Sequence, residues 1–306
     1  MVIPSFDRPE TLCSTTLTLL RCHEIPMDRV AVFVSPTTVQ TAGVPEWYRY
    51  VRTLKKQGFG DVHVVPGGHG LEQQMEKAFE WVGTGYAIVM SDFVKNIMES
   101  ATTSTGAAVL RPVPHGSLKW LWEHGAQVLT ATGCRAWSVN PSHNAICLKQ
   151  NIISRRLGLL DGNMTGIFLQ EDSKSFKVTP GHGLIYDVEF SAALWSQGYR
   201  FVRYMGLCCD HPYRGRGGQA TLWKNPTKRQ LAEDKAIKAA AKKFPTCLKW
   251  HAKPKSTLRV MQYTYLRDGD GPVTMVRRGR LGRPPVYNID RPSSSAQRTR
   301  RMRARK

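Results

Sequence analysis

The chain has 306 residues, of which 41% are hydrophobic, and this is enough apolar material for one large domain or for a domain with an extension. No apolar run reaches the roughly 18 residues of a membrane-spanning helix, so we expect no membrane partner. The first residues carry neither a basic segment nor a long apolar run, so we expect no secretory signal and a location in the cytoplasm or the nucleus.

The seven cysteines indicate a reducing environment. None of them forms a Cys-x-x-Cys pair, and their number is odd. Their spacing fits neither a zinc site nor a small disulfide framework. We therefore expect free thiols.

The charge of the chain is strongly positive, with a formal net value of +21. The segment 277–306 holds ten arginines and one lysine against one acid, Asp290, and the rest of the chain is also basic. Such a charge favours a polyanionic partner, and DNA is the partner we expect. The alternative is a disordered tail that aids solubility. Gly282-Arg283-Pro284-Pro285 is similar to an AT-hook core, which lies in the minor groove. The candidate nucleic-acid contacts are Arg277, Arg278, Arg280 and Arg283.

Strands and helices are expected to alternate four times in the first ninety residues. Short β-branched runs predict the strands, and apolar residues at helical spacing predict the helices between them. This alternation is typical of parallel strands joined by crossover helices, and thus of an α/β nucleotide-binding fold. The expected strands are 2–6, 31–35, 62–66 and 87–90, and the expected helices are 10–22, 47–57 and 71–82.

The remainder of the chain is less regular. We expect a strand at 144–149, a short helix at 150–157 and a turn at 160–163. Further on, we expect helices at 187–197 and 228–243 and a strand at 199–202. The expected organisation is a catalytic domain over 1–225, a basic helical extension over 226–268 and an Arg-rich disordered tail over 269–306.

Polar, small or charged residues follow the carboxyl ends of the four expected parallel strands. In open α/β sheets, ligands bind beyond this edge. Turn chemistry explains each of these residues singly, but four such turns at one edge predict a site. The residues are Asp7, Arg8, Ser35, the segment 66–70 and Asp92.

Three segments resemble the GT-A glycosyltransferases. VIPSFDRPETL at the start is similar to the family's first strand and turn. The stretch 67–94 resembles the helix and strand that lead to the family's DxD motif. The stretch 183–202, GLIYDVEFSAALWSQGYRFV, resembles its ED-containing helix. The resemblance implies a GT-A-like (Rossmann-like) α/β fold, in which a mixed sheet is flanked by helices.

The size and the charge narrow the resemblance to the TET/JBP-associated glycosyltransferases. Members of that group are linked to sugar transfer onto oxidised pyrimidines in DNA, in phages and in the base J pathway. The resemblance implies a transferase that moves a sugar from a nucleotide-sugar donor, expected to be a UDP-sugar, to a hydroxyl acceptor, expected to be a 5-hydroxymethylpyrimidine in DNA.

The resemblance also implies a set of donor-binding and metal residues. Ser91-Asp92-Phe93 stands at the DxD position, so only Asp92 remains to hold Mn²⁺ or Mg²⁺, and this departure puts the metal in doubt. His211 fits the place of a late metal ligand, and its alternative role is structural. Arginines in a glycine-rich loop are candidates to replace the metal. The expected donor-binding residues are Pro4, Ser5, Asp7, Arg8, Gly68, Ser91, Asp92, Arg214 and Arg216.

Asp187 is the expected general base. It matches the Asp of the ED motif, with Tyr186 in place of the Glu, and it stands at a predicted helix start. A carboxylate there takes the proton from the acceptor hydroxyl if transfer inverts the anomeric centre. A plain helix N-cap is the alternative role of Asp187, as it is of Asp7 before Pro9. Two other functions stay open: a transferase acting on protein or a glycan, and a non-catalytic DNA- or nucleotide-binding protein on a GT-A scaffold.

Overall fold

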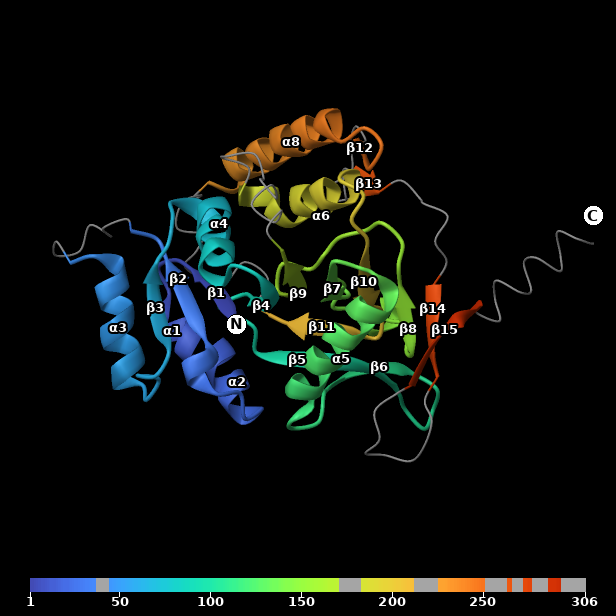
Figure 1. The fold of residues 1–306 in the computed structure, drawn as a ribbon, viewed down its shortest axis with the longest axis horizontal. Helices are drawn as coiled ribbons and strands as arrows, with labels where there is room; N and C mark the ends of the chain where they lie inside the picture. The colour runs from blue at the N-terminus through green and yellow to red at the C-terminus, as the bar shows by residue number, and fades with distance from the viewer. Residues whose placement is uncertain are drawn as a thin grey trace, which may run out of the picture.

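The centre of the molecule is a ten-stranded mixed sheet with helices on both faces (Figure 1). The strand order is β15-β14-β8-β10-β7-β9-β4-β1-β2-β3. This computed structural model describes residues 1–36, 44–170, 183–211, 225–250, 263–265, 272–276 and 286–292. No helix in these ranges is both long and apolar enough to cross a bilayer.

One half of the sheet is parallel and confirms the four strands predicted from the sequence. Each of its strands ends within one residue of the predicted end, and β1 lies between β2 and β4. Their β-branched runs favour extended backbone, and Asp, Gly and Pro residues follow the strand ends. These strands are β1 (Val2–Ser5), β2 (Ala31–Val34), β3 (His63–Pro66) and β4 (Gly85–Met90).

The helices that connect these strands also lie where the sequence predicts them. α3 (Glu46–Lys56) follows β2, and α4 (Gly70–Val82) follows β3. The first predicted helix is interrupted by a π-helical turn, Cys13–Leu17, which separates α1 (Pro9–Leu12) from α2 (Thr18–Cys22). Such turns are frequent at functional sites.

The other half of the sheet is mixed, and here two predictions were wrong. The stretch 144–149 contains a 3₁₀ turn, Ala145–Cys147, in place of a strand. The stretch 150–157 contains β8 (Ile152–Ser154) in place of a helix. β8 pairs antiparallel with β10, Ile153 opposite Tyr204, and this pairing decides the conformation of a stretch whose local propensity is ambiguous.

The remaining strands of the central sheet complete this half. β9 runs antiparallel between β4 and β7, and β7 runs parallel to β10. Beyond residue 269, β14 pairs antiparallel with both β8 and β15. The bounds are β7 (Ala136–Val139), β9 (Met164–Leu169), β10 (Phe201–Tyr204), β14 (Pro272–Val276) and β15 (Val286–Pro292).

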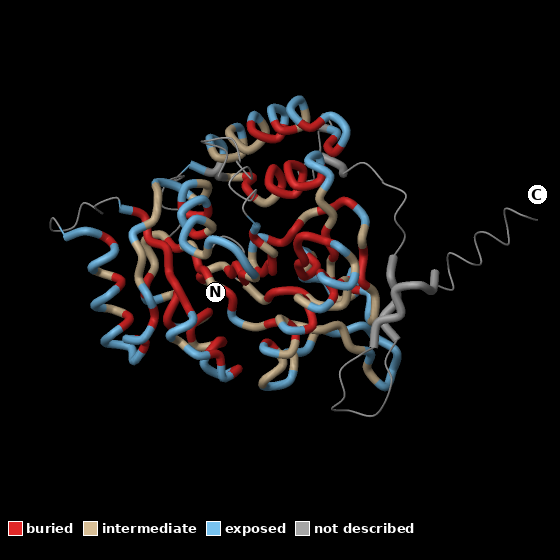
Figure 2. The backbone as a smooth tube through the Cα atoms, in the orientation of Figure 1, coloured by how far each residue is buried: buried red, intermediate tan, exposed pale blue. Residues whose placement is uncertain are grey.

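Two small sheets and several helices surround the large sheet. One small sheet has the order β11-β5-β6, and the other pairs β12 with β13. Helix α6 is buried along most of its length between the sheet and α8 (Figure 2). The strands are β5 (Asn96–Thr102), β6 (Ala108–Pro112), β11 (Leu207–Asp210), β12 (Leu248–Trp250) and β13 (Tyr263–Tyr265). The helices are α5 (Ser117–Thr132), α6 (Tyr186–Ser196) and α8 (Pro226–Lys243), with 3₁₀ turns at Met27–Arg29 and Gly183–Ile185.

The core has two parts, one on each face of the large sheet. Because side chains alternate along a strand, Ile3 packs with α1–α2, α3 and α5, whereas its neighbour Val2 packs with α4 and α6. Residues of α8 belong to the second part of the core. The predicted boundary at residue 225 therefore lies next to a helix that shares this core.

Trp137 is fully buried and packs closely against the backbone of α5 at Gly125. A Cβ added at Gly125 of α5 would lie 2.2 Å from Trp137 Nε1, whereas a Cβ at Gly60 meets nothing within 4 Å. Gly125→Ala is therefore expected to lower the free energy of unfolding by about 2 kcal/mol through overpacking. Urea denaturation measures this, with Gly60→Ala as the matched control. Equal free energies of unfolding for the two variants would contradict the close packing of Trp137 on Gly125.

Candidate active site

Asp92 occupies the loop after β4, beside the end of β1. Its side chain is 1% exposed, and one oxygen, Oδ2, accepts hydrogen bonds from Ser5 Oγ at 2.5 Å and from Arg8 Nε at 2.8 Å. Burial raises the pKa of Asp92, and the Arg8 guanidinium opposes that rise. Arg8 and Asp92, which were predicted to lie at one edge of the sheet, thus form a buried ion pair there, and Ser5 of β1 adds a supporting hydroxyl.

The π-helical turn holds the loop that carries Asp92. Thr16 is buried, its hydroxyl donates to the carbonyl of Ser91 at 2.8 Å, and it accepts from Val94 N–H at 2.9 Å. The Thr15 hydroxyl donates to the carbonyl of Thr11 at 2.6 Å and lies 3.2 Å from the carbonyl oxygen of Asp92. Thr16 of the π-helical turn thus fastens the loop on both sides of Asp92.

A directed chain of hydrogen bonds runs from the backbone of Arg8 to Asp92. Arg8 N–H donates to Tyr50 Oη at 3.1 Å, and Tyr50 Oη lies 2.7 Å from Ser5 Oγ. Since Ser5 donates its proton to Asp92, Tyr50 must donate to Ser5. The sequence predicted the helix that carries Tyr50 but offered no sign of this role, because Tyr50 also satisfies the apolar pattern of α3.

Asp7 sits in a strained turn that α3 holds in place. Its φ of 54° is unusual for a residue other than glycine. Its N–H donates to Glu46 Oε1, and its carboxylate pairs with Arg49 at 3.0 Å. Asp7 is not the N-cap of α1, because Arg8 takes that position. Burial raises the pKa of Glu46 to about 7, and its Oε2 has no hydrogen-bond partner among the described residues.

Phe93 connects Arg8 to His211. The Arg8 guanidinium lies 4.5 Å from the centre of the Phe93 ring, and the His211 ring meets Phe93 edge-on at 5.6 Å. His211 Nδ1 lies 3.2 Å from the carbonyl oxygen of Cys209, and burial lowers the pKa of His211. The aromatic residue in the last place of the expected DxD motif therefore packs against both neighbouring candidates.

Gly68 and Pro4 have structural explanations. A Cβ at Gly68 would lie 2.2 Å from Gln73 Cβ, so glycine permits the close approach of the loop to α4. Pro4 lies within β1, opposite Phe33 of β2. Donor contact by either residue stays a prediction.

Asp187 lies in the first turn of α6 and is partly buried. Its Oδ1 accepts from Val188 N–H at 3.0 Å, and burial raises its pKa to about 6. A base with a pKa just below neutrality is mostly ionised at pH 7 and still holds a proton well. The side chain thus combines a helix-start position with a suitable basicity.

The turn at 161–163 joins Asp187 to the loop of Asp92. Ser91 N–H donates to the carbonyl of Asn163 at 3.0 Å, and a Cβ on Gly162 would lie 3.6 Å from Asp187 Cβ. Asp161 is 4% exposed, and its Oδ1 accepts from both nitrogens of Asn163, at 3.1 and 2.7 Å. The sequence predicted this turn, but its place between the two candidates depends on contacts between distant parts of the chain.

The burial of Asp161 is expected to make the stability of the fold depend on pH. Burial, and then the charge of Asp187, raises its pKa from 3.8 to about 7. The stability that the neutral carboxyl provides is complete below 3.8 and is lost as the pH rises through about 7. An asparagine side chain cannot ionise. The free energy of unfolding of Asp161→Asn, relative to that of the wild type, should therefore increase by about 2 kcal/mol as the pH is raised from about 5 to about 8. Urea denaturation at both pH values measures this, with exposed Asp28→Asn as the control. A pH-independent difference would contradict the burial of this charge.

Several predicted contacts lie outside the described residues. They are Arg214 and Arg216 of the glycine-rich loop and the tail residues Arg277, Arg278, Arg280 and Arg283.

The described residues do not by themselves form a metal centre. In the ranges that the structure covers, no group of three His, Cys, Asp or Glu side chains is placed to hold an ion. The Oδ2 of Asp92 is already bonded to Arg8 and Ser5, and Phe93 packs against His211. Arg8 supplies a cation next to Asp92 at this end of the sheet.

Solved structures share this architecture. A mannosyltransferase from Pyrobaculum calidifontis, in complex with GDP-Man and Mn²⁺, aligns with 79% of this chain at a TM-score of 0.50 and 12% identity. The fold of this chain is of the GT-A type. Its alignment spans 63% of the mannosyltransferase. No family model and no curated protein matches the sequence.

Two further similar structures have lower scores. Glucosyl-3-phosphoglycerate synthase from Mycobacterium tuberculosis, in complex with Mn²⁺, UDP and phosphoglyceric acid, has a TM-score of 0.43 and 12% identity. That alignment covers 97% of this chain and 89% of the synthase. S. aureus TarS 1–349 has a TM-score of 0.41 and 9% identity, and its alignment covers 78% of this chain and 63% of TarS 1–349.

Proposed function

We propose that this protein is a glycosyltransferase that moves a sugar from a nucleotide-sugar donor, a UDP-sugar, to a hydroxyl acceptor. The observation that carries the proposal is the joining of three elements at the carboxyl edge of a GT-A sheet. These are the Arg8–Asp92 ion pair, the turn at 161–163 and Asp187. Together they supply a cation for a diphosphate and a base for a hydroxyl.

The proposed reaction uses the chain's own groups. Asp187 takes the proton of the acceptor hydroxyl, whose oxygen attacks the anomeric carbon of the sugar. The bond between that carbon and the diphosphate oxygen breaks, and the nucleoside diphosphate leaves with the electron pair. Arg8, held by Asp92, stabilises the negative charge on the diphosphate. Asp7 is proposed to hold the donor ribose through its carboxylate.

The proposed acceptor is a 5-hydroxymethylpyrimidine in DNA. The net charge of +21 supports a polyanionic acceptor, and the arginines at 277, 278, 280 and 283 are proposed to contact it. The 5-hydroxymethyl group projects from the edge of the base, so an enzyme can reach its hydroxyl in an unpaired strand and, through the major groove, in a duplex.

Nucleoside diphosphate release tests the proposal. The protein is incubated with a panel of nucleotide sugars, with and without hydroxymethylcytosine DNA, at low and high salt. We expect release that depends on DNA and falls at high salt. Release that ignores both DNA and salt would indicate a protein or glycan acceptor. Donor binding without any release would indicate a binding protein on a GT-A scaffold.

A further inference from the structure

The outer side of α3 is a basic surface that the proposed reaction does not use. Tyr50 and Leu54 face inward and are buried, whereas Arg52, Lys55 and Lys56 are exposed. No acidic partner of these three cations is found in the part of the chain that the structure describes. Arg49, which is paired with Asp7, lies on the same helix, so the surface begins beside the candidate site.

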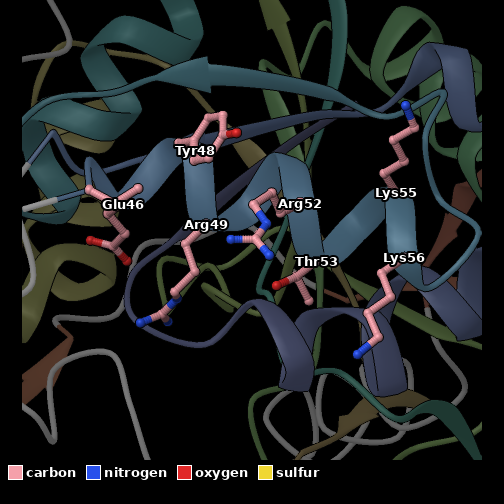
Figure 3. Close-up of a pocket in the computed structure, with 8 residues that line it drawn as sticks. Glu46, Tyr48, Arg49, Arg52, Thr53, Lys55 and Lys56 are labelled. Carbon is pink, nitrogen blue, oxygen red and sulfur yellow. The ribbon is translucent and has the colours of Figure 1, made fainter. Parts of the chain in front are cut away.

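This basic surface lines an open cavity of about 690 Å³ (Figure 3). Arg52 lies near the middle of it, with Tyr48 and Lys55 along one side and Arg49 and Lys56 along the other. Since a helix rises 1.5 Å per residue, the row from Tyr48 to Lys56 is about 12 Å long. That is about three to four times the roughly 3.4 Å between successive phosphates along one strand of a DNA helix.

Exposed aromatic side chains accompany the cations. Tyr48 is 45% exposed and Trp47 is 37% exposed, and their rings meet edge-on at 6.0 Å. Val44 and Val51 beside them are also exposed. Four of the eight exposed large hydrophobic residues in the described ranges thus gather on and just before this helix. Apolar surface concentrated in this way marks a contact surface.

We propose that the outer side of α3 binds a single strand of nucleic acid. Arg52, Lys55 and Lys56 contact its phosphates, and the exposed ring of Tyr48 stacks on a base. A stacking ring needs a base whose face is free, which an unpaired strand offers and a duplex does not. The inference rests on the proposed function for its DNA acceptor and narrows that acceptor to an unpaired strand, which the Arg49–Asp7 pair places next to the site.

Fluorescence anisotropy with a labelled single-stranded oligonucleotide, without donor, tests the charge contribution. The full chain is compared with the triple variant R52Q/K55Q/K56Q and with K228Q/K235Q/K242Q, which removes three exposed lysines from α8. We expect the α3 variant to bind about tenfold more weakly. Its salt slope should be smaller by about 2, since each phosphate contact on a single strand contributes about 0.7. Equal losses in the two triple variants would overturn the proposal.

Two substitutions of Tyr48 test whether its ring stacks on a base of the bound strand. Tyr48→Ala should weaken binding about tenfold, whereas Tyr48→Phe, which keeps the ring, should restore it to within about twofold. Thermal melting of each variant confirms that it is folded. Tighter binding of the matched duplex than of the single strand would overturn the proposal, and so would equal binding by Tyr48→Ala and the wild type. Because no donor is present, failure of sugar transfer would leave these outcomes unchanged.

Discussion

Asp187→Asn is expected to lower kcat for sugar transfer by about a thousandfold, since general-base catalysis contributes about 10²–10⁴. Asparagine keeps the size of the side chain and accepts from Val188 N–H, so the start of α6 should remain intact. The variant should bind donor as the wild type does, because Asp187 acts on the acceptor. Steady-state kinetics and isothermal titration with UDP measure the two properties separately.

The pH profile of the wild type tests the same assignment. Because burial raises the pKa of Asp187 to about 6, kcat/KM should increase about tenfold per pH unit below this value and level off above it. Asp61→Asn, a change at an exposed residue before β3, is the control and should leave the rate and the profile unchanged. Turnover by Asp187→Asn at the wild-type rate would remove the base assignment.

Asp92→Ala is expected to destabilise the fold by about 3 kcal/mol, because it leaves the largely buried Arg8 without its counter-charge. It should also weaken UDP binding about tenfold, since Arg8 then loses the contact that aims it. Urea denaturation and isothermal titration measure these effects.

Arg8→Gln separates a cation held by Asp92 from a metal held by Asp92. With Arg8 as the counter-charge of the diphosphate, Arg8→Gln should lose about tenfold in UDP affinity, both in Mn²⁺ and in EDTA. If instead Mn²⁺ bridged Asp92 and the diphosphate, Arg8→Gln would retain its affinity in Mn²⁺ and Asp92→Ala would lose affinity only there. Unchanged UDP binding by both variants would remove the diphosphate assignment.

The parallel half of the fold was predictable from the sequence because its signals are local. β1 and β4 are β-branched runs bounded by turn residues, and helices at 3.6-residue spacing connect them. The stretch 150–157 was predicted wrongly because its conformation depends on the pairing of Ile153 with Tyr204, a partner far along the chain.

In the candidate site, too, some features follow from local sequence signals and others depend on contacts between distant parts of the chain. The meeting of Arg8 and Asp92 follows from the rule that the carboxyl ends of parallel strands meet at one edge. The roles of Tyr50 and Asp161 do not follow from any motif, since a buried tyrosine and a turn aspartate are common in proteins. Only the fold brings Tyr50 to Ser5 and the turn of Asp161 to Asp187.

The proposed reaction of this chain is the transfer of a sugar to a modified base in DNA. Its most direct test is mass spectrometry of the nucleosides after the protein is incubated with UDP-sugars, Mn²⁺ and hydroxymethylcytosine DNA. Asp187→Asn serves as the control. We expect a hexose or pentose mass added to the modified nucleoside by the wild type and not by the variant. Unmodified nucleosides would contradict DNA as the acceptor, and if no nucleoside diphosphate were released from any donor either, sugar transfer itself would be contradicted.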